Sequence, residues 1–113
     1  MSEEETDVCF DNAYEELISN MLKDNISTDC ITKNLYMPDK LEDGLIYVSL
    51  YPSDYSVIDY DGTVHNELME KEDIKEVAIS YIMQYEEYDR QGIIKLTVRP
   101  IGAETYYRPD DKM

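Results

Sequence analysis

This sequence of 113 residues has no tryptophan, one histidine, two cysteines and four isolated glycines. No apolar run approaches the eighteen or so residues that mark a membrane-spanning helix. The chain begins Met-Ser-Glu-Glu-Glu-Thr-Asp, the opposite of the basic region that opens a secretory signal peptide. Together these absences predict a cytoplasmic protein that does not associate with membranes.

The residues needed for metal or covalent chemistry are scarce. One histidine, His65, and two separated cysteines do not form the ligand cluster of a zinc site. Cys9 and Cys30 lie in no C-x-x-C pair, so free thiols are expected in a reducing compartment, with a disulfide between them as the alternative. An EF-hand loop aligned on Gly62 would place Val57 at its first position, where an oxygen ligand is required. The sequence therefore predicts no metal, no cofactor and no catalytic residue.

Basic residues are also few, with 10 Lys and Arg against 26 Asp and Glu and a net charge of −16. Solubility of a small domain needs a net charge of only about 2–8. A compact domain of this length is roughly 35 Å across, which gives about one excess charge per 2 Å, compared with one per roughly 1.7 Å along duplex DNA. This charge disfavours direct binding of nucleic acid and favours a cationic protein partner.

The first half of the chain predicts one helix followed by strands. Residues 1–10 are acidic and expected to fray, and residues 11–113 form one domain. Apolar residues between 14 and 22 recur at helical spacing and predict a helix over 12–24. Residues 26–37 fit either a strand or a short helix. Residues 45–51 alternate between apolar and other side chains and predict a strand. Residues 55–60 predict a second strand, which a two-residue turn at Asp61-Gly62 would connect to a third at 63–65.

Residues 71–89 carry a stripe of apolar residues at a period of 3.6, which predicts a second helix ending near Gly92, with a strand as the alternative. Residues 94–98 predict a strand, and residues 103–107 its returning partner. The predicted fold is α+β, with two helices packed on one face of a mostly antiparallel sheet of about five strands.

Acidic residues and tyrosines are interleaved along the predicted central strands and the start of the second helix. Tyrosine offers a large, rigid contact area, and carboxylates can pair with the Arg and Lys of a partner. These features predict a partner-binding surface made of Asp54, Tyr55, Asp59, Tyr60, Asp61, Glu67, Glu70, Glu72, Asp73, Glu86 and Glu87.

The chain is similar in composition to phage-encoded anti-restriction, anti-CRISPR and glycosylase-inhibitor proteins, which present carboxylates in place of phosphates. This resemblance of class implies a non-enzymatic inhibitor that binds the cationic surface of a nuclease or other nucleic-acid-binding protein. An immunity protein or antitoxin against a basic nuclease toxin, or a small carboxylate-dependent enzyme, are the alternatives. A homodimer could form through the strand at 45–51 or that at 103–107.

Overall fold

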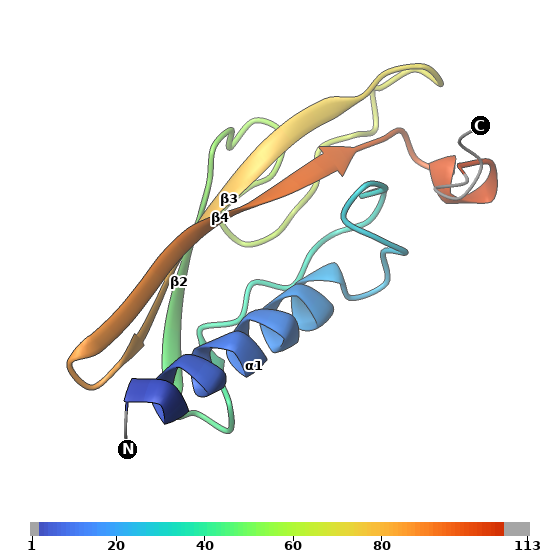
Figure 1. The fold of residues 1–113 in the computed structure, drawn as a ribbon. Coiled ribbons are helices and arrows are strands. Elements are labelled where there is room, and N and C mark those ends of the chain that lie inside the picture. Colours follow the sequence, from blue (N-terminus) through green and yellow to red (C-terminus); the bar gives the residue numbers. More distant parts are fainter. Residues whose placement is uncertain (1–2, 108–113) are drawn as a thin grey trace.

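The computed structural model describes residues 3–107 as one helix against an antiparallel sheet. Helix α1 spans Glu3–Leu22, and the strands are β1 (Lys40–Leu41), β2 (Ile46–Pro52), β3 (Lys75–Tyr85) and β4 (Tyr88–Val98). The order across the sheet is β1-β2-β3-β4, so neighbours in the sequence are also neighbours in space. A short 3₁₀ helix, Ala103–Thr105, follows. Figure 1 shows α1 lying along one side of the sheet. The α+β class is confirmed, with one helix and four strands in place of two and about five.

A hairpin of two long strands forms the centre of the molecule. Strands β3 and β4 pair continuously from Lys75–Val98 to Tyr85–Tyr88, and Glu86 and Glu87 make the turn. Glu86 has a φ of +53°, and a positive φ in a two-residue loop is typical of the hairpin turns that match the twist of paired strands. This hairpin runs the length of the sheet and aligns everything packed on it.

The expected second helix over 71–89 is wrong, because most of this segment is strand β3 and its end is the turn into β4. Its residues alternate with a period of two, since Val77, Ile79, Tyr81 and Met83 are buried while Ser80 and Gln84 are exposed. The apolar residues of this segment fit both a helical spacing and the alternation of a strand. Its β-branched residues and tyrosines favour the strand. The strand alternative is the correct one.

Gly92 does not end a helix but lies in β4 opposite Tyr81. A Cβ atom on Gly92 would meet three atoms of the Tyr81 phenol group, all within 2.8 Å. Tyr81 is buried and packs beside Tyr14 of α1, with ring centroids 5.6 Å apart. The glycine is therefore required because an aromatic side chain crosses its backbone.

The core lies between α1 and the inner face of the sheet. Phe10, Ala13, Leu17 and Met21 form the buried stripe of the helix, at spacings of three and four residues. The helix was expected over 12–24, but it begins at Glu3 and Thr6 is already buried. Within residues 3–107, no helix is both long enough and apolar enough to cross a membrane.

The segment left open between 26 and 37 is neither a regular strand nor a helix. Asn25 holds it in place, because its side chain accepts hydrogen bonds from the N–H groups of Thr32 and Lys33. Ile31 then forms a single parallel bridge with Val98 at the end of β4. This contact covers only the last part of the β4 edge.

Two predicted strands are absent. In the 55–60 segment, the carbonyl of Asp54 accepts hydrogen bonds from the N–H groups of Val57 and Ile58, which closes a helical turn instead of a strand. Only one bridge, between Ile58 and Val64, remains of the expected hairpin. Residues 103–107 contain the 3₁₀ helix and no returning strand.

These differences also change where a second copy of the chain could pair. The strand expected at 45–51 is β2, which lies inside the sheet between β1 and β3. The other expected edge, 103–107, is not a strand. The 103–107 segment therefore offers no strand edge, whereas β1 pairs only with Ile46 and Tyr47 and leaves the rest of β2 without a strand on that side. The longer exposed edge of the described sheet belongs to β4.

We expect Gly92→Ala to lower the free energy of unfolding by about 1–3 kcal/mol, because the added methyl group overpacks the buried Tyr81 ring. Urea denaturation followed by circular dichroism measures this loss. The matched control is the same substitution in a Tyr81→Leu background, where the phenol group is absent and the loss should shrink. An equal loss in both backgrounds would contradict the packing explanation.

Candidate functional site

Most of the predicted partner-binding residues lie in one segment, residues 53–74, which we call the acidic lobe. The lobe leaves β2 after Pro52 and returns to the sheet at β3. Ser53 fixes its start, because its N–H donates to the carbonyl of Ala78 and its hydroxyl accepts from the Ala78 N–H. Asn66 fixes its middle, because its side-chain amide donates to the carbonyls of Thr32 and Arg99. The lobe is therefore attached to the sheet at separate points.

Two turns of the lobe present aspartates and tyrosines to solvent. Val57 and Ile58 are buried beneath the first turn, so that Asp54 and Tyr55 point outward. The second turn closes when the N–H of Asp59 donates to the carbonyl of Thr63. Tyr60, at its tip, is 71% exposed, one of the most exposed large side chains.

The second turn needs a glycine. Gly62 has a φ of +94°, and its carbonyl accepts a hydrogen bond from Leu35. A Cβ atom there would collide with the carbonyl oxygen of Leu35. The turn that carries Asp59, Tyr60 and Asp61 is thus held against the segment that follows α1.

The last part of the lobe holds the remaining predicted acids. Glu70 and Asp73 are linked twice, since the N–H of Asp73 donates to the Glu70 carbonyl and the N–H of Glu70 donates to the Asp73 carboxylate. The side chains of Glu67 and Glu72 form no hydrogen bond or ion pair with any other described residue. They are exposed and available to a partner.

Glu86 and Glu87 lie far from the lobe. They form the hairpin turn at the other end of β3, and a strand of eleven residues spans roughly 35 Å at about 3.3 Å per residue. Figure 1 shows this turn at the lower left, beside the start of α1, and the chain leading into β3 at the upper right. The structure therefore divides the predicted binding residues into two groups rather than joining them in one patch.

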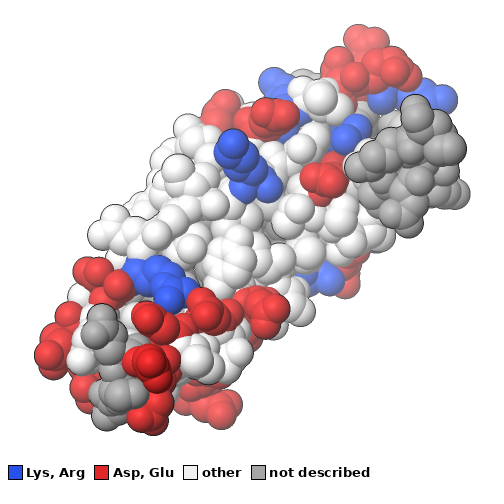
Figure 2. All heavy atoms as spheres, in the orientation of Figure 1, with Lys and Arg blue, Asp and Glu red and all other residues white. Residues whose placement is uncertain are grey.

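The end of the molecule around this hairpin turn is a second acidic region, which we call the acidic end. Three segments meet there, because Arg90 next to the turn reaches α1 and the turn from β1 to β2 lies at the same end of the sheet. Figure 2 shows acidic atoms crowded at this end and again at the opposite end, with a paler band between them. Its carboxylates are those of Glu4, Glu5, Asp7, Asp11, Glu42, Asp43, Glu86, Glu87 and Asp89.

Sequence reasoning identified only Glu86 and Glu87 at the acidic end. Glu4, Glu5 and Asp7 were assigned to a frayed terminus, and most of the others stand in short turns far apart in the sequence. The missing information was the register, since β2 pairs Tyr47 with Gln84 and thereby brings both turns to one end.

Few of these carboxylates are neutralised within the chain. Within residues 3–107, the Arg90 guanidinium lies 2.6 Å from a carboxylate oxygen of Asp11 and 3.4 Å from one of Asp7. In the lobe, His65 lies 3.7 Å from Asp59.

Two aspartates of the lobe have lowered pKa values. Hydrogen bonds from the Ser56 hydroxyl and N–H lower the pKa of Asp54, and the Thr63 N–H similarly lowers the pKa of Asp61. These two groups stay charged to a lower pH than an ordinary aspartate.

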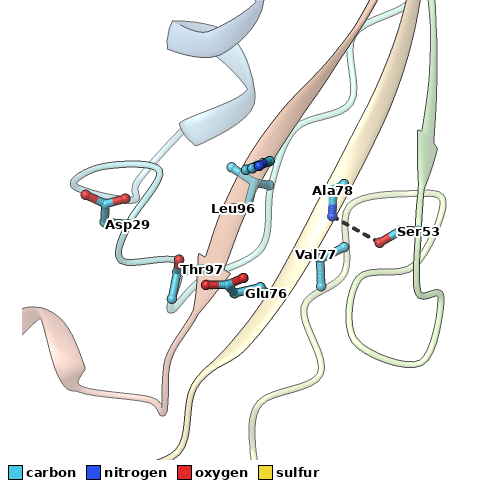
Figure 3. Close-up of a pocket in the computed structure, with 8 residues that line it drawn as sticks. Asp29, Ser53, Glu76, Val77, Ala78, Leu96 and Thr97 are labelled. Carbon is cyan, nitrogen blue, oxygen red and sulfur yellow. Dashed lines mark hydrogen bonds between the residues drawn. The ribbon is translucent and has the colours of Figure 1, made fainter.

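A hollow of about 510 Å³ opens on the sheet where β3, β4 and the 26–37 segment meet. Asp29, Glu76 and Thr97 bring side-chain oxygens toward it, and the hydrogen bond between Ala78 and Ser53 lies beside it (Figure 3). Both carboxylates are exposed to solvent. None of the predicted partner-binding residues lines this hollow.

A smaller hollow of about 340 Å³ lies between the lobe and the start of β3, where Ser56, His65, Glu67, Asp73 and Lys75 line it together with two apolar residues. Residues from the start of the lobe, such as Ser56, and from its end, such as Asp73, therefore lie around the same hollow. Within residues 3–107, no group of three His, Cys, Asp or Glu side chains is placed to hold a metal ion.

The cysteines are not joined. Cys9 lies in α1, half-buried, and Cys30 is fully buried beside the end of β4. Burial raises the pKa of both thiols, so neither is activated as a nucleophile. The free-thiol expectation fits this placement.

No known protein-family model matches this chain, and no curated protein is significantly similar to it. Its function must therefore be argued from its own residues.

We expect Ser56→Ala to raise the pKa of Asp54 toward the ordinary value, because the hydroxyl is the first of the two groups that stabilise its charged form. A carboxyl ¹³C titration by NMR measures the change. Since a lowered pKa stabilises the folded state at neutral pH and this contribution is lost as the pH falls through it, the variant should also respond less to acid. Ser49→Ala, an exposed serine on β2, is the control, and an unmoved Asp54 pKa in Ser56→Ala would contradict the assignment.

Proposed function

We propose that this protein is a cytoplasmic, non-enzymatic inhibitor that docks on the cationic nucleic-acid-binding surface of another protein. The observation that carries the proposal is the set of exposed carboxylates at both ends of the long axis, which outnumber the nearby basic side chains. Such groups can form charge-assisted hydrogen bonds with the Arg and Lys side chains that normally hold phosphates. Their complementary field would also speed encounter with a cationic partner.

The dimensions refine which nucleic acid the charge imitates. The molecule measures 49 × 32 × 19 Å, with a radius of gyration of 15.4 Å. Its long axis therefore exceeds the roughly 35 Å expected for a compact domain with this number of residues. A net charge of −16 over this axis is about one per 3 Å, close to the 3.4 Å of a single strand and well above the 1.7 Å of a duplex. This spacing is an average, because the carboxylates gather at the two ends of the axis.

The lobe supplies the ordered part of the surface. The carboxylates of Asp54, Asp59 and Asp61 each accept a hydrogen bond from a backbone N–H within their own turn. Such turns lose little conformational freedom on binding, which favours affinity. Tyr55 and Tyr60 are exposed between these acids and would act as anchors.

We expect immobilised protein to capture a nucleic-acid-binding protein from host lysate at low salt and to release it at high salt, because charge pairs dominate the contact. The decisive step is competition, in which the captured protein's binding to labelled nucleic acid is measured with and without this chain. Loss of that binding supports the proposal. Simultaneous binding of both, or no captured cationic protein at low salt, contradicts it, and a toxin nuclease as partner would identify an immunity protein.

The lobe and the acidic end can be tested separately with isosteric variants. Glu67→Gln with Glu72→Gln removes two charges from the lobe, and Glu86→Gln with Glu87→Gln removes two from the hairpin turn. Each pair should weaken capture about tenfold if its region is bound. Glu15→Gln with Asp24→Asn removes the same charge from α1 and the turn after it, and should leave capture nearly unchanged. Equal losses in all three would show that net charge, and no particular surface, drives capture.

A further inference from the structure

Strand β4 has a free edge. It is the last strand of the sheet, and Figure 1 shows no strand beyond it. The N–H and carbonyl of Thr97 point away from β3, because they bond to the carbonyl of Thr28 and the N–H of Ile31. The pairing of β4 with β3 has no interruption, so backbone groups that point outward recur at every second residue. Asp89, Gln91, Ile93 and Lys95 therefore present their backbone groups outward.

These outward groups have no partner in the chain. Within residues 3–107, no hydrogen bond to the backbone of Asp89, Gln91, Ile93 or Lys95 is made on that side. The free stretch ends at the hairpin turn on one side and at Thr97, already bonded, on the other. It covers residues 88–96, and its midpoint is Gly92.

We propose that β4 pairs antiparallel with β4 of a second copy of this chain, with the two-fold axis at Gly92. In this register Asp89 stands opposite Lys95 of the second copy, and Gln91 stands opposite Ile93. All of these residues point their backbone groups outward, so each pair exchanges two hydrogen bonds. A single register thus satisfies the whole free edge and joins two sheets into one.

Charge complementarity selects this partner. In a chain with a net charge of −16, the free edge carries Asp89 and Lys95 at equal distances from Gly92. Lys95 is exposed and forms no ion pair with another described residue. Opposite charges directly across an antiparallel pair are favourable, and like charges are not. The edge is therefore complementary to itself, although the whole molecule repels its copies.

A residue without a side chain stands at the two-fold axis. At a non-hydrogen-bonded pair the two Cα atoms approach to about 4.5 Å, the closest spacing in an antiparallel ladder. Gly92 meets its own copy there, and its Cβ position is already taken by Tyr81. Because the two copies of β4 run antiparallel, the acidic hairpin turn of each copy lies beside Thr97 of the other copy. The two acidic turns are therefore far apart.

Sedimentation equilibrium at rising protein concentration and at two salt concentrations tests the dimer. We expect a monomer–dimer equilibrium that strengthens with salt, because salt screens the repulsion between two acidic molecules more than it weakens two short pairs. Capture of a cationic partner should weaken with salt, so the two proposals can fail independently. A chain that remains monomeric at high concentration and high salt would overturn this one.

Charge exchange tests the register. Lys95→Asp alone, or Asp89→Lys alone, places like charges opposite each other twice per dimer and should weaken association about tenfold. The double variant, Asp89→Lys with Lys95→Asp, restores opposite charges and should recover most of it. Both residues are exposed, so thermal unfolding should change little. Failure of the double variant to recover association would reject the register centred on Gly92.

Backbone substitution tests the edge itself. Ile93→Pro removes an outward N–H without removing a bond to β3, since proline is tolerated on that side of an edge strand. It should abolish dimerisation while thermal unfolding of the monomer is retained. Ile93→Ala keeps the N–H and is the matched control, with dimerisation expected to persist. Equal dimerisation of both variants would show that the interface lies elsewhere.

Discussion

The pairing of β3 with β4 is the interaction on which the rest of the structure depends. Helix α1 packs on its inner face and is tied to β4 by Arg90, which bonds Asp11 and lies over the Phe10 ring. The acidic lobe is attached to β3 through Ser53 and Ala78. The segment after α1 is attached to the end of β4 through Ile31. Each other part of the fold is thus positioned relative to one hairpin.

This hairpin also separates the charges. Its inner face is apolar, and the middle of its outer face carries neutral side chains such as Ser80, Ile82 and Ile93. Carboxylates consequently gather beyond the strand ends, in the lobe and around the turn, where they are farthest apart and best solvated. An elongated shape with two acidic ends lowers the self-repulsion that a high net charge imposes on a compact fold.

The sequence predicted those features that depend on neighbouring residues and failed for those that depend on pairing between distant segments. The helical stripe from Tyr14 to Leu22, the alternation in β2 and the turn at Asp61-Gly62 are local, and each was recognised. The strands expected on either side of that turn did not form. The 71–89 segment failed because Val77, Tyr81 and Tyr85 satisfy both a helical and an alternating spacing, and only pairing with β4 decides between them. Exposure of Tyr55 and Tyr60 followed from local turns. The acidic end depended on strand register, which no single segment of the sequence contains.

The separation of α1 from its partners has a consequence for biosynthesis. Asp11 contacts Arg90, 79 residues later, and the core face of α1 packs on strands that end at Val98. At about 5–20 residues per second, translation takes several seconds to proceed from α1 to the end of β4. During that time Leu17 and Met21 have no sheet to pack against, so the nascent helix is an exposed site for chaperones until the last strand emerges.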